Sequence, residues 1–544
     1  MKSHNLPHET DYIVIGGGTS GLVVACRLSE NPSIRITVLE AGPDCRQDPR
    51  IQTPDAWDTL SESELNWKMS FIPQTGLHDR GQDHRTGKVL GGSSAINGLV
   101  FVPPSPAGID AWAKLGNDKW TWESLRPYLQ KCYAVTAPEG LPLFHKQEHD
   151  AAAGPIQISC PMADDKIGMR LTQAWDDAFR SQGYETNNPD LLAENTTTGT
   201  RPLFSTIDPK TGKRSSADSQ YGTIAASRLN VRICTETTVQ EILFDSSSLD
   251  LLATGVRVNY NGETITIKAN KEVILAAGAF CSPMILEHSG IGDSEWLGHL
   301  SIPVKIDQPN VGRNLQNHLM NIIPVPIKAK SGIEDAKLGL KGLGFMRVSP
   351  NEQDKLLGAY TETEGRPNET IRSIIQHPNE ASASTLLSLI SPELAVVGVI
   401  NSYPFSRGSL HTSSNGFKET PIADAAFLSN ELDLELLARN VRNMYDLIRS
   451  PELGQYLDLG DVPDDIESIK TSIRANALAT NHICGTLAMF PRSAGGVVDQ
   501  DLKVYGTQNL RVVDASIFPL TPHANPLATV YAVAERAADL IRGF

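Results

Sequence analysis

Three glycines near the start of the chain and one glutamate after them have the spacing of a dinucleotide-binding site. Gly16, Gly18 and Gly21 form the pattern Gly-x-Gly-x-x-Gly, and Glu40 follows about 20 residues later. Such glycines permit a tight turn and close approach of the backbone to a pyrophosphate, which the free N–H groups of a helix N-terminus can bind. A carboxylate at Glu40 can accept hydrogen bonds from ribose hydroxyls. These residues predict an adenosine-containing dinucleotide cofactor, either NAD or FAD.

The elements that must position these residues have the order strand, helix, strand. Residues 12–15 predict a short buried strand, residues 22–28 the apolar face of a helix, and residues 34–39 a second strand. Two later segments, residues 272–277 and 510–513, are short β-branched runs that end in small residues. If both rejoin the N-terminal sheet, the nucleotide-binding domain is assembled from three separated pieces of the chain.

The chain as a whole has the composition of a soluble globular protein. Its 544 residues are 40% hydrophobic and 20% charged, which excludes a disordered, collagen-like or coiled-coil chain. The net charge of −15 would repel phosphate backbones and anionic membrane surfaces, so we expect no nucleic acid partner and no membrane partner. The polar first ten residues lack the apolar stretch of a secretory signal, and no long apolar run follows, so we expect a cytoplasmic protein.

Two longer segments then identify a family. Residues 87–97, GKVLGGSSAIN, with their continuation to Asp110, resemble the first signature of the glucose-methanol-choline (GMC) oxidoreductases at every defined position. Residues 278–292, GAFCSPMILEHSGIG, resemble the second signature. The C-terminal residues 481–541 are similar to the end of the same family, so the resemblance covers essentially the whole chain.

The resemblance implies an α/β fold with two parts. One is a Rossmann-like FAD-binding domain, expected to comprise residues 1–104, 226–320 and 475–544. The other is a substrate-binding domain built on an antiparallel sheet, expected to comprise residues 105–225 and 321–474. The inserted portions are the least similar to the family, so the substrate is not identified by the sequence.

The resemblance also makes FAD the expected cofactor. It implies an ADP site near the glycine turn, flavin contacts after the first signature, an adenine contact through the backbone of residue 239, and further contacts from the C-terminal segment. The implied cofactor-binding residues are Gly16, Gly18, Thr19, Ser20, Gly21, Glu40, Ala41, Gly91, Ser93, Asn97, Gly98, Leu99, Val239, Asp514, Ala515, Pro526 and Leu527. Some family members bind flavin covalently through a histidine just before this asparagine. Here that position is Ile96, so we expect non-covalent FAD.

The expected catalytic pair lies in the C-terminal segment. His482 stands where the family places its catalytic base, and an imidazole can accept the hydroxyl proton of an alcohol while the α-hydrogen leaves as hydride. The family's second catalytic position is a histidine or an asparagine shortly before the last helix. Counting back from that helix favours Asn525, whose amide can donate to the substrate oxygen. The alternative is His523, which would make a pair of histidines or else line the substrate pocket.

Two other groups of residues carry weaker expectations. His78, His84 and Arg85 are clustered without the carboxylate or cysteine spacing of a metal site, and we expect them to cover the flavin or to lie at the surface. No metal is expected elsewhere, because the seven cysteines are scattered.

In the second signature, Ser282 can cap a helix that opens at Pro283.

These expectations describe an FAD-dependent oxidoreductase that converts the CH–OH group of a small-molecule alcohol to an aldehyde or ketone. Hydride would go to flavin N5, with His482 as the base, and O₂ or another acceptor would reoxidise the flavin. One alternative is a flavoprotein of secondary metabolism that performs a cyclisation or dehydration without net redox change. Another is a non-enzymatic FAD-binding protein, which would need neither His482 nor a polar partner beside it.

Overall fold

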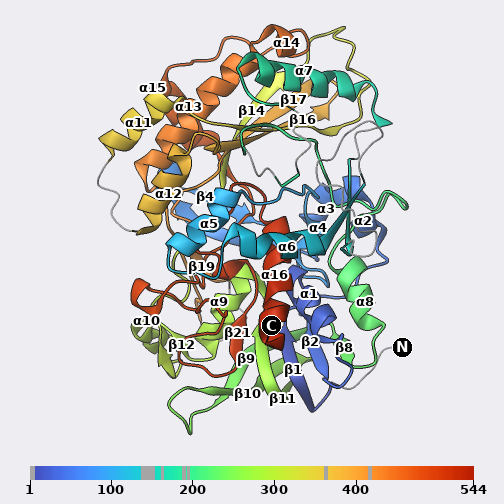
Figure 1. The fold of residues 1–544 in the computed structure, drawn as a ribbon, viewed down its shortest axis with the longest axis vertical. Coiled ribbons are helices and arrows are strands. Elements are labelled where there is room, and N and C mark those ends of the chain that lie inside the picture. The colour runs from blue at the N-terminus through green and yellow to red at the C-terminus, as the bar shows by residue number, and fades with distance from the viewer. Residues whose placement is uncertain are drawn as a thin grey trace.

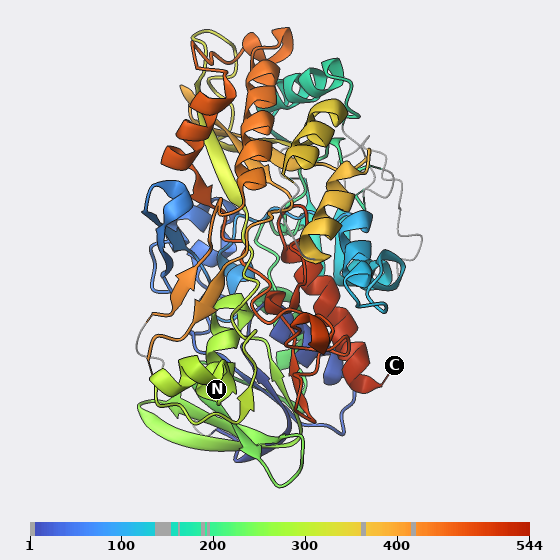
Figure 2. The same ribbon diagram turned by 90° about the vertical axis from the view of Figure 1, so that its left-hand side faces the viewer.

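Two large sheets, with helices packed over them, make up most of the molecule (Figure 1). The computed structural model describes residues 6–136, 154–160, 164–186, 191–192, 196–360, 366–414 and 420–543. In both views the last helix, α16 (Leu527–Arg542, red), starts between the sheets and runs beside the first of them (Figures 1 and 2). Within the described ranges no helix is long and apolar enough to cross a membrane.

The first sheet joins segments that are far apart in the sequence. Its parallel part has the order β8-β2-β1-β11-β21, and β10 and β9 continue it antiparallel from β11. Its strands are β1 (Glu9–Ile15), β2 (Ile36–Leu39), β8 (Val231–Cys234), β9 (Thr237–Asp245), β10 (Leu252–Tyr260), β11 (Glu263–Leu275) and β21 (Leu510–Val512). The pairing of β1 with β11, and of β11 with β21, confirms that both later segments rejoin the N-terminal sheet.

The helix that follows β1 is held by apolar packing. α1 (Thr19–Leu28) buries an almost continuous apolar run against the sheet and against α16. Between these helices the buried carboxylate of Glu535 accepts hydrogen bonds from the Arg27 guanidinium and from the Tyr221 hydroxyl. A buried carboxylate requires such partners, and here they fix α16 against α1.

The second sheet is antiparallel and shows a different side-chain pattern on each face. Its strands, in spatial order, are β20 (Leu478–Ala479), β14 (Leu319–Pro326), β17 (Leu394–Asn401), β16 (Ala383–Ser391), β15 (Gly339–Met346) and β7 (Gly199–Thr200). One face, with Leu387, Leu389 and Val397, packs into a core with α7 (Gly168–Ser181), α13 (Glu431–Ile448) and α15 (Ile466–Asn476). The other face borders a cavity between the two sheets.

The proposed domain boundaries stay a prediction. β20 lies within residues 475–544, which we assigned to the FAD-binding domain, and it pairs with β14 of the second sheet.

Shorter elements connect the two sheets or cover their edges. The other described helices are α2 (Pro49–Gln52), α3 (Trp57–Leu60), α4 (Ser93–Ile96), α5 (Pro106–Lys114), α6 (Trp122–Cys132), α8 (Thr223–Ala226), α9 (Gly278–His288), α10 (Ser294–His299), α11 (Pro350–Ala359), α12 (Arg366–Gln376) and α14 (Pro451–Gly454). The other described strands are β3 (Met69–Gln74), β4 (Arg80–His84), β5 (Tyr133–Thr136), β6 (Ile156–Ser159), β12 (Ile291–Gly292), β13 (Ile306–Asp307), β18 (Ser409–His411) and β19 (Ile422–Asp424).

The helix of the second signature begins earlier than the sequence suggested. α9 starts at Gly278, so Pro283 lies inside the helix and Ser282 does not cap it. A proline has no N–H, which leaves the carbonyl of Ala279 without its helical donor. The hydroxyl of Thr486 donates to that carbonyl at 2.7 Å. The expected start at Pro283 was wrong because this partner comes from a distant segment.

Candidate active site

A large cavity lies between the two sheets. Its volume of about 1370 Å³ exceeds the roughly 300–1,000 Å³ of ordinary small-molecule pockets, so it can hold a cofactor and a substrate together. The first turn of α1 and the end of β2 line one side of it. The open face of the second sheet lines the other.

Two glycine-rich turns meet at one end of the cavity and form a cradle. Gly16 has φ +101°, and a Cβ there would lie 2.4 Å from the carbonyl oxygen of Ala276. The N–H of Gly91 donates to the carbonyl of Gly17 at 2.7 Å, so the two turns are joined directly. At Gly18, by contrast, the nearest atom to a built Cβ is Gly92 Cα at 3.7 Å. The N-terminus of α1 has no side-chain cap, so its N–H groups are available for a pyrophosphate.

Glu40 holds the glycine turn in place. One carboxylate oxygen accepts from the N–H of Gly17 and the other from the N–H of Gly42, both at 2.8 Å. Burial raises the pKa of Glu40 to about 7, and the N–H groups around it act in the opposite direction. The carboxylate also lines the cavity, where its lone pairs can reach a ligand. Its contact with ribose stays a prediction, and its clasp on the turn is a second role that the sequence did not suggest.

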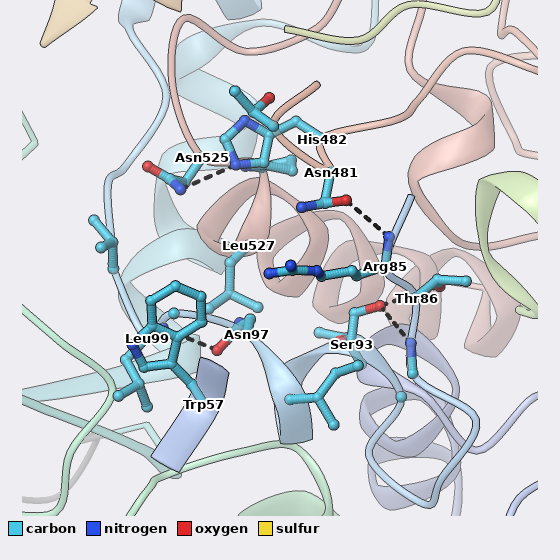
Figure 3. A pocket seen from close by; sticks show the side chains of 18 of the residues that line it. Trp57, Arg85, Thr86, Ser93, Asn97, Leu99, Asn481, His482, Asn525 and Leu527 are labelled. Carbon is cyan, nitrogen blue, oxygen red and sulfur yellow. Dashed lines mark hydrogen bonds between the residues drawn. The ribbon is translucent and has the colours of Figure 1, made fainter. Parts of the chain in front are cut away.

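Residues after the first signature form a flat wall below the middle of the cavity (Figure 3). Asn97 Oδ1 accepts from the N–H of Leu99 at 3.0 Å and from the buried guanidinium of Arg214 at 2.9 Å. These bonds hold Leu99 in a left-handed conformation with φ +69°. Trp57 lies beside Gly98, where nothing else approaches a built Cβ within 4 Å. The wall therefore has room for a planar ring system.

His482 lies on the opposite side of this space, beside Asn525 (Figure 3). Its Nε2 is 3.1 Å from Asn525 Nδ2, and its Nδ1 is 2.9 Å from His318 Nδ1. The fully buried His318 also places its Nε2 3.2 Å from the carbonyl oxygen of Ser402. The three side chains and this carbonyl form one continuous chain of hydrogen bonds.

The direction of that chain follows from its last member. A carbonyl oxygen only accepts, so Nε2 of His318 carries the proton and its Nδ1, in the neutral ring, is an acceptor. His482 must then donate from Nδ1, which leaves its Nε2 unprotonated. Asn525 donates its amide N–H to that nitrogen. The single lone pair of Nε2 accepts this bond at the cavity lining, where a substrate hydroxyl can take the place of the Asn525 N–H as donor.

Burial keeps both histidines neutral. It lowers the pKa of His482 well below its usual value, and the rings of His318 and His84 act in the same direction. Burial likewise lowers the pKa of His318 to about 4. Both rings are therefore in the basic form at neutral pH, as a proton acceptor requires.

One polar segment, residues 314–318, positions both loops of the catalytic pair. Asn317 Oδ1 accepts from the N–H of His482 at 2.9 Å, and the backbone of Gln316 exchanges hydrogen bonds with Cys484. The side chain of Gln316 bonds the carbonyl of Pro519 and the N–H of Thr521, in the other loop. The sequence analysis missed this segment. The only available signal was a polar run, RNLQNH, directly before an apolar strand.

The two candidates for the second catalytic position lie in different surroundings. Asn525 lines the cavity within hydrogen-bonding distance of His482. His523 is buried, its Nδ1 accepts from the N–H of Ser105 at 3.1 Å, and its ring packs 5.2 Å from that of Phe345. His523 is not among the residues that border the cavity.

Most of the other predicted cofactor-binding residues are brought together around the cavity. The predicted residues that line it are Gly16, Gly18, Thr19, Ser20, Glu40, Ala41, Ser93, Asn97, Gly98, Leu99, Val239, Asp514, Ala515, Pro526 and Leu527. Gly21 and Gly91 lie behind this lining, where a Cβ on Gly21 would meet the Gly16 carbonyl oxygen at 2.0 Å. Their contribution is to let the turns approach each other.

The cluster of His78, His84 and Arg85 lies partly on the cavity lining and partly at the surface. His84 and Arg85 line the cavity, and the Arg85 side chain extends into it below His482 (Figure 3). The backbone N–H of Arg85 donates to Asn481 Oδ1 at 2.8 Å. His78 is exposed at the end of a short turn. In the described part of the chain no group of three or more His, Cys, Asp or Glu side chains is placed to hold a metal ion.

Comparisons with known proteins agree with this architecture. Models of the GMC oxidoreductases match residues 10–320 and 404–534. The GMC oxidoreductase family protein Mala s 12 of Malassezia sympodialis is 32% identical over 98% of this chain and 92% of its own. An oxygen-dependent choline dehydrogenase of Chromohalobacter salexigens is 31% identical over 98% of this chain and 95% of its own.

Solved structures agree as well. An FAD-dependent oxidoreductase from Chaetomium thermophilum superimposes with a TM-score of 0.88 at 27% identity, over 98% of this chain and 99% of its own. A fungal aryl-alcohol oxidase gives 0.84 at 26% identity, with the same coverage. The family and this likeness imply FAD as the cofactor, and the cradle, flat wall and facing imidazole fit it. The chain belongs to the glucose-methanol-choline oxidoreductase family.

Proposed function

We propose that this protein oxidises the CH–OH group of a small-molecule alcohol to an aldehyde or ketone, with non-covalently bound FAD. The observation that carries the proposal is the chain of hydrogen bonds from Ser402 through His318 to His482, which makes Nε2 of His482 an acceptor at the cavity lining, beside Asn525 and opposite the wall formed by residues 97–99. A protein that only stored FAD would have no need of a neutral imidazole held in one tautomer. The names of the choline dehydrogenase and aryl-alcohol oxidase relatives support the same reaction class.

The residues of the chain divide the work of this reaction. FAD, when bound, supplies the hydride acceptor. His482 Nε2 takes the hydroxyl proton as the α-hydrogen leaves the substrate carbon as hydride, so a C=O bond forms. When the substrate hydroxyl takes the place of Asn525 as donor to Nε2, the amide N–H of Asn525 is released and can donate to the substrate oxygen, where negative charge develops. α16 begins at Leu527, two residues after Asn525, without a side-chain cap, and its N-terminus favours negative charge in the cavity.

Non-covalent binding of FAD rests on the cavity lining. Ile96 borders the cavity and has no nucleophilic atom. Flavin released into the supernatant after acid precipitation is the expected result. Flavin that stays with the polypeptide would contradict it, and peptide mass mapping would then test His84, Cys160 and Cys281, the histidine and cysteines on the lining apart from His482.

Anaerobic mixing of the holoenzyme with a panel of alcohols tests the reaction. The flavin absorbance should bleach with at least one alcohol and recover when O₂ or a dye acceptor is added. His482→Ala should retain FAD and lose the bleaching. Product formation while the flavin stays oxidised would instead support a cyclisation or dehydration without net redox change.

A further inference from the structure

The cavity-facing side of the second sheet forms an apolar surface that the proposed chemistry does not use. Along β16 the residues that line the cavity are Ser384, Thr385, Leu386, Ser388 and Ile390, and apart from Thr385 they alternate as expected for one face of a strand. We call the apolar members of this face the floor: Met320, Leu340, Leu343, Leu386, Val396 and Ile400. The lining residues that belong to β14, β15, β16 and β17 carry no charge, and Lys337, directly before the exposed Leu338, is the charged lining residue that adjoins them in the sequence.

One end of the floor adjoins the catalytic pair. β14 begins directly after His318, and β17 ends just before Ser402, whose carbonyl accepts from His318. In the sheet register Met320 lies opposite Ile400, which lies opposite Ser384. This row therefore marks the catalytic end.

The other end of the floor lies far along the same strands. Val396 is opposite Ser388, which is opposite Leu340, and Ile390 follows one step further. At about 3.3 Å per residue, Ser384 and Ile390 are about 20 Å apart along β16. The cavity extends over this whole length.

Large apolar side chains are exposed where the far end opens. Leu338 is 55% exposed and Ile390 51%, and both line the cavity. Exposed apolar side chains that continue into a cavity mark a ligand site, because water contact with them is unfavourable.

We propose that the alcohol oxidised at His482 carries an extended, uncharged apolar tail that lies on the floor and leaves the cavity between Leu338 and Ile390. The inference rests on the proposed function and names its substrate class. The distance of about 20 Å from the Ser384 row to Ile390 matches an alkyl chain of roughly a dozen carbons or more, at about 1.3 Å per carbon from standard bond lengths. A short polar alcohol would leave the whole floor in contact with water.

For such a substrate the bonds that break and form are those of the alcohol oxidation proposed above. One C–H bond breaks and its electron pair leaves with hydrogen as hydride, and the hydroxyl proton goes to His482. The C=O bond forms on the terminal carbon, and O₂ or another acceptor takes the two electrons from the reduced cofactor.

Chain-length dependence tests the proposal. The holoenzyme is assayed with straight 1-alkanols from butanol to hexadecanol, by anaerobic flavin reduction and by turnover with a dye acceptor. We expect kcat/KM to rise roughly twofold to fourfold per methylene group until the floor is filled, and then to level off. 6-Hydroxyhexanoate, which places a charge on the floor, should react at least tenfold less efficiently than hexanol.

Substitutions at the far end give the second test. Val396→Asp should lower the ratio of kcat/KM for dodecanol to that for butanol at least tenfold, with FAD content unchanged. Leu340→Asn provides the same test if the first variant does not fold. Ile72→Asp is the matched control, because Ile72 is 40% exposed and lies outside the cavity lining, and it should leave the ratio as it is.

The outcomes separate this inference from the one on which it rests. A flat or falling profile with chain length, while alcohols still reduce the flavin, would overturn the apolar-tail inference alone. An unchanged ratio in folded Val396→Asp and Leu340→Asn would do the same. If no alcohol of any length reduces the flavin, the proposed function fails and the inference fails with it.

Discussion

Nδ1 of His318 lies 2.9 Å from Nδ1 of His482, and this contact determines which nitrogen of His482 faces the substrate. Because His318 donates its only proton to the Ser402 carbonyl, it can receive one from His482 but cannot give one. The relation makes His318 a positioning residue, since it acts on the substrate only through the tautomer of His482.

His318→Leu should therefore slow flavin reduction without removing FAD. Loss of the acceptor allows His482 to place its proton on Nε2, where it cannot act as a base, and we expect a rate about 10²-fold lower, within the range of general-base effects. Because His318 also lowers the pKa of His482, the acid limb of the pH profile should move to higher pH. His318→Gln, which retains an acceptor, is the matched control and should recover much of the rate. Equal losses in both variants, with an unmoved limb, would point to packing alone.

The pH dependence of kcat/KM separates His482 from Asn525. The pKa of His482 lies below its ordinary value of 6.5, so activity should be lost only as the pH falls through a midpoint below 6.5, where the base becomes protonated. Asn525→Ala should be about 10² to 10³-fold slower and keep this limb, because an amide does not titrate. His482→Ala should lose the limb together with about 10² to 10⁴ in rate.

His523→Ala tests the choice of register. His523 packs outside the cavity lining, so this variant should alter thermal stability more than it alters the flavin reduction rate. If its flavin reduction collapsed while Asn525→Ala stayed near wild type, the catalytic pair would be His482 with His523.

Local sequence was sufficient for the parts of the fold that depend on neighbouring residues. The glycine turn, α1 and the strands on either side of it follow from spacing and apolar periodicity within residues 9–39, and the observed strands overlap the expected ones. The start of α9 was misplaced for the opposite reason. From its neighbours alone, Pro283 is expected at the first position of a helix. It can lie inside α9 because the distant Thr486 hydroxyl donates to the Ala279 carbonyl, which lacks its helical donor.

The sequence suggested the site residues that lie in a recognisable motif. It did not suggest those that the fold brings together from distant segments. The resemblance suggested His482 as the catalytic base. Its partner His318 lies 164 residues away in the sequence and belongs to neither of the two signature segments. The floor was equally hidden. Both faces of β16 and β17 are largely buried. The apolar residues of β17 form a nearly continuous run, and those of β16 are interrupted by serine and threonine on both faces, so alternation cannot show which face meets the cavity.

Glu40 offers a test of the cofactor site. Replacing it with alanine removes the predicted acceptor for ribose hydroxyls, a charge-assisted bond worth about 1.5 to 3 kcal/mol, so FAD affinity should fall by roughly one to two decades. The same change leaves the N–H groups of Gly17 and Gly42 without their acceptor, so the apoprotein should also unfold at lower urea concentration. FAD titration by fluorescence quenching measures the first effect and urea unfolding the second. Unchanged affinity with reduced stability would restrict Glu40 to holding the turn.

The bond between Thr486 and the carbonyl of Ala279 gives a prediction about stability that can be tested by a double-mutant cycle. Thr486→Val preserves the side-chain shape and removes the donor, so a buried carbonyl is left unsatisfied and the free energy of unfolding should fall by about 1 to 3 kcal/mol.

Pro283→Ala supplies the matched background for that cycle. Alanine restores the helical N–H that proline lacks, and this N–H can donate to the same Ala279 carbonyl, four residues earlier in α9. In that background Thr486→Val should cost less than half as much, and the difference between the two costs is the coupling energy. Urea unfolding of the four proteins measures it. If Thr486→Val costs the same with Pro283 and with alanine, the carbonyl is not what the threonine stabilises. If the coupling is present, the Thr486 hydroxyl ties α9 to the loop of His482. Flavin reduction should then be slowed in Thr486→Val and stay slow in the double variant, where the carbonyl regains a donor but the loop does not regain its bond to α9.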